Sequence, residues 1–156
     1  MMKRNIMEVT AAIILDNDRF LICQRPKGKN CELLWEFPGG KIEVGETGES
    51  CIIRECSEEL GIIIGDVQYF ESVTQEYPDR TVHLSFYFAR IVSGSLERKE
   101  HNALDWITCD DITQYNFCPA DKQMLDRHKT KLILACKQAK KTYCSEKHTR
   151  ARRTKC

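Results

Sequence analysis

Short apolar runs separated by polar turns occupy much of the chain and predict strands. Residues 9–15 form a continuous apolar run that is typical of a buried strand. A polar turn follows, and residues 20–25 predict the returning strand. Residues 67–77 and 81–92 predict a hairpin, because apolar residues alternate along the second segment with the period of a strand. Residues 104–107 are a further short strand candidate.

Two other segments carry the signals of helices. In residues 47–60, Thr47 can act as the N-cap and Gly61 provides a stop. A second helix is expected to begin at Pro119. Strands combined with one internal and one terminal helix predict an α/β sandwich around a mixed sheet. The apolar residues that the second helix can bury are Met124, Leu125 and Leu132.

The composition is that of an ordinary globular domain. Of the 156 residues, 42% are hydrophobic and 30% are charged, and this length suits one domain with a real core. No apolar run reaches the roughly 20 residues that span a bilayer. Residues 9–15 are also too short for the apolar core of a signal peptide. We therefore expect a cytoplasmic protein with no membrane partner, as a monomer or a homodimer.

Nine cysteines raise the question of a zinc site or a metal-storage role. Their number is odd and no C-x-x-C pair occurs, whereas zinc ligands usually come in closely spaced pairs. Scattered cysteines in a cytoplasmic chain are mostly small buried hydrophobic residues. Zinc binding stays open as an alternative, which metal analysis of the purified protein tests.

The net charge of +1 hides an acidic body with a basic end. Residues 129–156 hold ten Lys and Arg against one acid, while residues 1–128 hold fourteen against 22, so the two parts carry +9 and −8. We expect a folded domain over residues 1–135 and a basic, disordered tail over residues 136–156. Such a tail can bind nucleic acid through phosphates, although simple solvation is the more common use.

Three glutamates fall on one stripe of the first predicted helix. At about 100° per residue, Glu58 and Glu59 lie near −60° and +40° from Glu55, so the three carboxylates share an arc of about 100°. Like charges at this spacing repel, and a bound hard cation such as Mg²⁺ resolves the repulsion. The preceding glycines, Gly39 and Gly40, let backbone atoms approach a ligand closely. The core-facing residues on the same wheel are Ile52, Ile53, Cys56 and Leu60.

This stretch resembles the Nudix box, the signature of the Nudix hydrolases. Gly40 is followed at the matching spacing by Glu46 and by Arg-Glu-Cys-Ser-Glu-Glu-Leu-Gly-Ile at residues 54–62. The match spans 23 residues, and its one departure is Cys56, where a larger aliphatic residue is common. The resemblance implies an α/β/α sandwich with a mixed central sheet. Segments that look like the MutT-type branch are residues 34–41, 77–80 and 119–121, and Glu100 six residues before Trp106, so that the similarity covers about residues 8–130.

The resemblance implies a magnesium site that Mn²⁺ can also fill. Glu100 would complete the metal shell or act as general base, although a surface acid is an equal alternative. His101 competes for the base role, with a lower rank. Arg54 would orient the catalytic carboxylates through charge-assisted bonds, and Glu46 would join the loop to the helix. The implied metal ligands are the Gly39 carbonyl, Glu55, Glu58, Glu59 and Glu100, and the implied catalytic residues are Glu55, Glu58, Glu100 and Arg54.

Substrate contacts are implied at five further positions. Arg25 matches the family's nucleotide contact, Lys41 can bind phosphate or remain a solvated charge, and Arg80 has a weaker claim. Phe37 would stack on or wall the base, or else pack in the core. Asp121 occupies the position where members specific for oxidised guanine usually have asparagine. An ionised aspartate only accepts hydrogen bonds, so it can accept from the cytosine amino group or from the N–H that oxidation creates on guanine.

These residues imply a nucleoside triphosphate pyrophosphohydrolase that releases a nucleoside monophosphate and pyrophosphate by in-line attack of water. We expect it to remove oxidised purine triphosphates such as 8-oxo-dGTP, and thus to protect DNA. A CTP or broad pyrimidine pyrophosphohydrolase is the alternative within this class. A non-catalytic Nudix module that binds nucleotide or nucleic acid is the alternative outside it, although degenerate modules usually lose the glutamates that this helix keeps.

Overall fold

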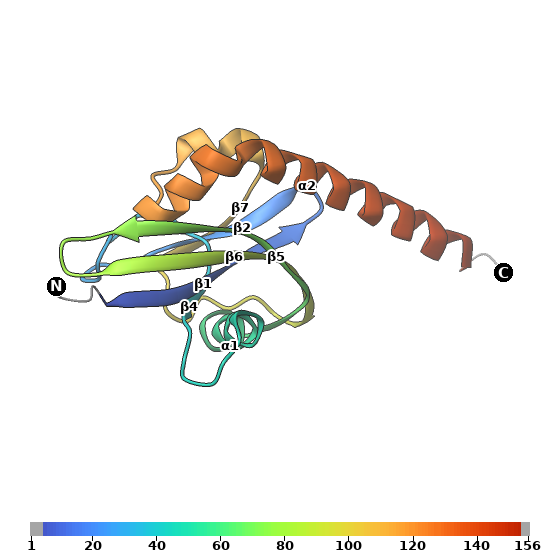
Figure 1. Ribbon diagram of the computed structural model, residues 1–156. Helices are drawn as coiled ribbons and strands as arrows, with labels where there is room; N and C mark the ends of the chain where they lie inside the picture. Colours follow the sequence, from blue (N-terminus) through green and yellow to red (C-terminus); the bar gives the residue numbers. More distant parts are fainter. Residues whose placement is uncertain (1–4, 154–156) are drawn as a thin grey trace.

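The computed structural model describes residues 5–153 and arranges them as a sheet between two helices (Figure 1). Helix α1 (Gly48–Leu60) covers one face of the sheet, and α2 (Pro119–Arg153) covers the other. This arrangement confirms the predicted α/β/α sandwich. The strands are β1 (Ile6–Asp16), β2 (Arg19–Gln24), β3 (Trp35–Glu36), β4 (Gly39–Lys41), β5 (Ile62–Glu76), β6 (Thr81–Gly94) and β7 (Ala103–Ile107), and a 3-10 helix η1 (Cys109–Gln114) precedes α2.

Strand β1 lies in the middle of a mixed sheet with the order β3-β2-β1-β6-β5. It runs parallel to β6 and antiparallel to β2 and β4, while β7 pairs with β2. Helices cover both faces of the sheet, so residues of both alternating sets on β1 are buried. This explains why residues 9–15 are continuously apolar rather than alternating.

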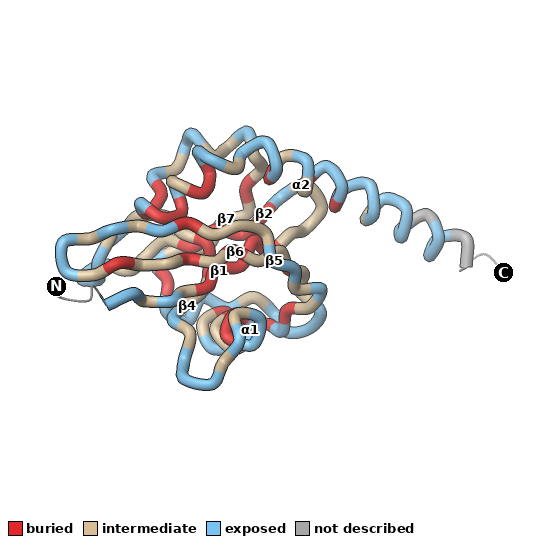
Figure 2. The backbone as a smooth tube through the Cα atoms, viewed as in Figure 1, coloured by how far each residue is buried: buried red, intermediate tan, exposed pale blue. Residues whose placement is uncertain are grey.

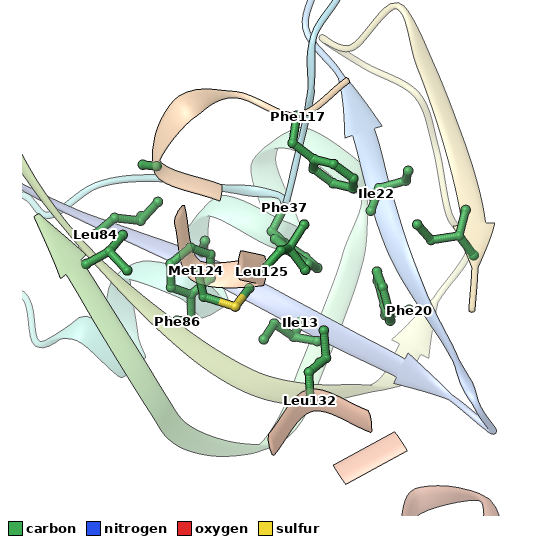
Figure 3. Packing of buried hydrophobic residues seen from close by; sticks show 14 of the residues in the cluster. Ile13, Phe20, Ile22, Phe37, Leu84, Phe86, Phe117, Met124, Leu125 and Leu132 are labelled. Atoms are coloured by element: carbon green, nitrogen blue, oxygen red, sulfur yellow. The ribbon is translucent and has the colours of Figure 1, made fainter. Parts of the chain in front are cut away.

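The sheet separates two hydrophobic clusters. On the α2 face, Ile13 of β1 packs with Phe20, Phe37, Phe86 and Met124, as Figure 3 shows. The next residue of β1, Ile14, points to the α1 face and packs in the second cluster. Successive residues of a strand point to opposite faces, so neighbours in sequence serve different cores. The residues packed with Ile14 include Ala12, Leu21, Cys23, Ile52, Cys56, Leu60, Ile62, Ile64 and Ala89.

Both strands of the predicted hairpin are longer than the apolar pattern indicated. Strand β5 begins at Ile62, directly after α1, rather than at residue 67. Ile62 and Ile64 are buried against α1, and β5 pairs antiparallel with β6 through several register shifts. The bulges interrupt the period of two, which is why the sequence pattern located only the later part of β5.

Helix α1 is confirmed with its predicted cap and stop. The Thr47 side chain accepts a hydrogen bond from the Ser50 N–H at 3.1 Å, and Ser50 Oγ accepts from the Thr47 N–H at 3.0 Å. Gly61 ends the helix in a left-handed conformation with φ 67°. Three of the predicted core-facing residues are buried, whereas Ile53 is exposed. Ile53 lies at the edge of the buried stripe, where it lines a shallow surface groove with Ile63 of β5.

Helix α2 differs from the prediction at its C-terminal end. It crosses the predicted boundary at residue 135 and continues to Arg153, where a disordered tail was expected. Cys136 and Ala139 are buried, and Lys140 binds Asp18 at 2.9 Å. Leu132, Cys136 and Ala139 form an i, i+4, i+7 apolar stripe. This stripe extends past residue 135, where the sequence predicted the end of the domain. Beyond this stripe the helix projects from the body and most of its described residues are exposed, although Tyr143 is half-buried and Glu146 lies 4.0 Å from Arg90 of β6 (Figures 1 and 2).

The described residues contain no helix that combines the length and the apolarity needed to cross a bilayer.

Candidate active site

The glycine turn lies directly against the acidic stripe of α1. Strand β4 pairs with the middle of β1, where Gly40 faces Thr10. A Cβ atom built on Gly40 would lie 2.3 Å from the carboxyl carbon of Glu55. Only glycine therefore allows the Glu55 carboxylate to approach the backbone of the turn this closely. The glycine turn therefore lies close to the acidic face of α1, as the sequence predicted.

Arg54 connects the glutamates of the motif. Its guanidinium binds both oxygens of Glu46, with Nε at 2.6 Å from one and a terminal nitrogen at 3.0 Å from the other. The other terminal nitrogen donates to Glu55 at 2.9 Å and to Glu58 at 3.1 Å. The hydrogen bonds from Arg54 lower the pKa of Glu46 to about 2. This geometry agrees with the expected roles of Arg54 as an orienting residue and Glu46 as a support.

The three glutamates of the stripe differ in their environments. The side chains of Glu55 and Glu59 are 14% exposed, whereas that of Glu58 is 58% exposed. Burial, followed by the nearby charges of Glu55, Glu100 and Glu36, raises the pKa of Glu59 to about 9. Burial also raises the pKa of Glu55, against the hydrogen bond from Arg54. Two carboxyl groups are thus held in places that disfavour negative charge, as a cation site without its cation would do.

A divalent cation fits the chemistry of these donors. The Oε2 atom of Glu59 is buried and has no hydrogen-bond partner among the described residues. Buried polar atoms are rarely left unpaired, and carboxylate oxygens are the ligands that Mg²⁺ and Mn²⁺ prefer. Within residues 5–153, no three His, Cys, Asp or Glu side chains are already drawn together as a metal cluster. The glutamates are therefore candidate ligands that a cation would have to bring closer.

The loop before β7 brings Glu100 and His101 to this site in different ways. Glu100 is exposed, yet its charge contributes to the raised pKa of both Glu55 and Glu59. The His101 side chain is 5% exposed, and its Nε2 atom lies 3.6 Å from Glu36 and 3.8 Å from Glu59. The sequence favoured Glu100 over His101 as the general base, but in the structure His101 is the more buried of the two.

Arg25 lies beside the acidic stripe and is held by Glu36. One guanidinium nitrogen contacts the two Glu36 oxygens at 3.1 and 3.2 Å, and Nε donates to the Asn30 carbonyl at 2.6 Å. Arg25 also acts on the pKa of Glu59, lowering it. Lys41, in contrast, is exposed. Glu36 had no predicted role. No sequence pattern pointed to it, because its place on β3, opposite Cys23 of β2 and in contact with Arg25, is set by the fold.

Asp121 is fully enclosed near the start of α2. Its Oδ1 atom accepts a hydrogen bond from the backbone N–H of Phe37 at 2.9 Å. Burial, followed by the charge of Glu36, raises the pKa of Asp121 well above its ordinary value. The sequence suggested an ionised residue that only accepts hydrogen bonds. The environment of Asp121 instead favours the neutral carboxyl group, which can also donate.

Phe37 packs in the core. It is 3% exposed and stacks on Phe117, with ring centroids 6.3 Å apart, while Phe20 and Phe86 contact it from other sides (Figure 3). This position corresponds to core packing and differs from the expectation that the ring stacks on or walls a base. Large aromatic surface gains most when it is buried, and three aromatic partners enclose this ring.

Arg80 packs on the ring of Tyr77. Its guanidinium lies over the Tyr77 ring at 5.0 Å from the centroid and donates to Asp79 at 2.8 Å. Burial raises the pKa of Tyr77, with smaller contributions from Cys31, Cys118 and Asp121. The charge of Asp121 thus reaches Tyr77, which lies in the matching segment of residues 77–80 but had no predicted role of its own and is a candidate nucleotide contact.

The chain is similar to a known family and to several known proteins. The family model described as "NUDIX domain" matches residues 6–128. The chain is 37% identical to a CTP pyrophosphohydrolase of Escherichia coli, over 78% of this chain and 90% of that protein. It is 35% identical to an 8-oxo-dGTP diphosphatase of Proteus vulgaris, over 64% of this chain and 90% of the relative. The solution structure of the E. coli ORF135 protein superposes with a TM-score of 0.68 at 36% identity, covering 79% of this chain and 88% of that one.

Proposed function

This chain belongs to the Nudix domain family, and on that premise we propose that it is a magnesium-dependent nucleoside triphosphate pyrophosphohydrolase. The family match and the named relatives confirm the predicted resemblance and the enzyme class, a Nudix hydrolase. The proposed reaction is attack of water on the phosphate chain, which releases a nucleoside monophosphate and pyrophosphate. The observation that supports a working active site most directly is the unpaired, buried oxygen of Glu59 beside Glu55 and the glycine turn.

The residues proposed to hold Mg²⁺, or Mn²⁺, are Glu55, Glu58 and Glu59 with the Gly39 carbonyl. Glu100 is proposed to join them or to accept a proton from water. When bound, the metal would neutralise phosphate charge and make water a better nucleophile. The raised pKa of Glu59 and the unpaired Oε2 atom support a cation next to this side chain.

The remaining polar residues are proposed to position the reacting groups. Arg54 holds Glu55 by one nitrogen and Glu46 by a bidentate contact, so Glu55 has little freedom to turn away from Gly40. Arg25 is proposed to contact the nucleotide from its place on Glu36. Lys41, which is exposed, and Arg80, which lies over Tyr77, are proposed to contact phosphates.

The base is proposed to be an oxidised purine, as in 8-oxo-dGTP. A neutral Asp121 carboxyl group both donates and accepts, as does the asparagine of the members that read oxidised guanine. The raised pKa of Asp121 favours the neutral carboxyl group, which can take the place of that asparagine, and it therefore supports the purine proposal. A preference for CTP is the second candidate, and the identity to the E. coli CTP pyrophosphohydrolase favours it.

A substrate panel with pyrophosphate readout tests the proposal. Purified protein with Mg²⁺ is given 8-oxo-dGTP, dGTP, CTP and dCTP, and we expect the highest kcat/KM for 8-oxo-dGTP. Higher kcat/KM for CTP would reverse the order of the two candidates. In Glu58→Gln, turnover should fall about 100-fold or more, whereas Glu49→Gln on the first turn of the same helix should retain it. Absence of turnover with every nucleotide would favour the non-catalytic module.

A further inference from the structure

His101 is a buried histidine placed between two carboxylates. Its Nε2 atom lies 3.6 Å from Oε1 of Glu36 and 3.8 Å from Oε2 of Glu59. Its Nδ1 atom is buried without a hydrogen-bond partner in the described part of the chain, as is the Glu59 oxygen that faces Nε2. Two unsatisfied buried atoms thus belong to one pair of residues. A group of this kind calls for an explanation in a folded protein.

The loop that carries His101 is tied at both ends to the two parts of the site. Before the histidine, the Glu97 N–H donates to the Leu60 carbonyl at 2.8 Å and the Lys99 N–H to the Glu59 carbonyl at 3.4 Å, which joins the loop to α1. After the histidine, Asn102 binds Gln24 of β2 at 2.9 Å through its backbone and at 2.6 Å through its side chain. The position of His101 therefore depends on both α1 and β2.

Glu36 approaches the same point from the other edge of β2. Residues Cys23 and Gln24 pair with β3 on one side and with β7 on the other. Glu36 on β3 holds Arg25 at 3.1 and 3.2 Å. Arg25, Glu36, His101 and Glu59 thus form a chain of neighbouring side chains, in that order.

We infer that His101 is a positioning residue, whose ring N–H holds the Glu59 carboxylate in place for the metal and couples it to the Glu36–Arg25 pair that faces the nucleotide. This inference rests on the proposed function. In the tautomer with the proton on Nε2, one N–H lies between two acceptors and can donate to Glu36, to Glu59 or to both. Small shifts of either carboxylate would bring it within hydrogen-bond distance. Neighbours that orient metal ligands in this way contribute to metal affinity although they do not touch the metal.

Direct titration of the nucleotide-free protein with Mn²⁺, followed by electron paramagnetic resonance, tests the role of His101. His101→Leu removes the N–H at similar volume, and we expect Mn²⁺ affinity to fall by about 10- to 100-fold. His101→Gln places an amide N–H near the position of Nε2, and its affinity should stay within about 3-fold of the wild type. His83→Leu, on β6 and away from this contact, should leave the affinity unchanged.

The two variants separate positioning from packing and from proton transfer. Equal affinities in wild type and His101→Leu, or equal losses in His101→Leu and His101→Gln, would overturn the inference. So would a loss of kcat of about 100-fold or more in His101→Gln with normal Mn²⁺ affinity, because that pattern indicates a general base. Circular dichroism of each variant verifies folding.

Glu36→Gln gives a second, independent test that does not depend on the folding of His101→Leu. We expect it to lower Mn²⁺ affinity by about 3-fold or more, although Glu36 is not a proposed metal ligand, and its effect should not add to that of His101→Leu. Unchanged affinity in Glu36→Gln would overturn the coupling to Arg25. A wild-type protein that binds Mn²⁺ but turns over no nucleotide would remove the proposed function alone, while one that binds no Mn²⁺ would remove both.

Discussion

Asp121 accepts a hydrogen bond from the backbone N–H of Phe37, and this contact joins the start of α2 to a residue two positions before Gly39 of the glycine turn. The two residues are 84 positions apart in sequence, and both are buried. The contact satisfies a backbone donor that would otherwise be enclosed without a partner. The same enclosure raises the pKa of Asp121, so the stability of the fold should depend on its protonation.

The stability of the protein should depend on pH through Asp121. The folded state holds this proton more tightly than the unfolded chain, so the contribution of Asp121 is complete below its unfolded pKa near 3.8 and declines as pH rises. Asp121→Asn cannot ionise and still accepts from the Phe37 N–H. In urea unfolding from pH 4 to 8, the free energy of unfolding of the variant should rise relative to that of the wild type as pH increases. If the wild type instead became more stable relative to the variant over this range, the raised pKa of Asp121 would be contradicted.

Asp121→Ala serves as the companion variant, because it removes the acceptor as well as the charge. The buried Phe37 N–H would lose its partner, at a cost of about 1–3 kcal/mol. In urea unfolding at pH 4, where the charge difference is smallest, Asp121→Ala should be less stable than Asp121→Asn.

Glu46 should give the opposite dependence at acid pH. Its pKa is lowered from 4.5 to about 2 by Arg54, so its stabilising effect is present above pH 4.5 and is lost as pH falls toward 2. Acid unfolding followed by circular dichroism should therefore show a smaller dependence on pH in Glu46→Gln than in the wild type. The two curves should converge near pH 2, and curves that stay parallel throughout would count against the Glu46–Arg54 contact.

Gly40→Ala should separate catalysis from folding. The added Cβ would lie 2.3 Å from the Glu55 carboxyl carbon, and the end of a flexible side chain can move away with little effect on the fold. We expect a thermal midpoint near that of the wild type and at least a 100-fold loss of turnover, since small displacements of catalytic groups have effects of about this size.

Gly45→Ala is the matched control for this experiment. No atom lies within 4 Å of the position that its methyl group would take, but the φ of 85° at this residue is unfavourable for alanine. The substitution should lower stability by about 1 kcal/mol and retain turnover. If Gly40→Ala kept full activity, Glu55 would not require its place against the turn.

The two halves of α2 should contribute very differently to stability. Leu132 is fully buried against the sheet, and Leu132→Ala should cost about 2–5 kcal/mol in thermal or urea unfolding. A chain ending at Lys141 keeps this contact and the Lys140–Asp18 pair. It loses the largely exposed Arg90–Glu146 ion pair, and its stability should fall by only about 0.5 kcal/mol. Turnover should be unchanged in the shortened chain. A large loss of stability there would mean that the projecting end of the helix packs on the body.

Local patterns along the chain were sufficient to predict much of this architecture. The apolar run of β1 and the alternation in β6 identified strands, because burial on one or two faces leaves a period in the sequence. Thr47 and Gly61 identified the ends of α1, because caps act through adjacent backbone atoms. The three glutamates could be placed on one stripe because 3.6 residues complete each helical turn. The same stripe with its glycine turn indicated the metal chemistry.

Only the tertiary structure decided how each of these groups is used. The sequence placed Glu55, Glu58 and Glu59 together, but in the fold Glu59 is largely buried beside His101, whereas Glu58 is exposed. The pKa of Asp121 is raised by segments that lie far away in the chain, and His101 lies near Glu36 and Glu59 only in the folded protein. The physical reason is that secondary structure follows from neighbours a few residues apart, whereas burial and the local electric field depend on every segment that packs around a group.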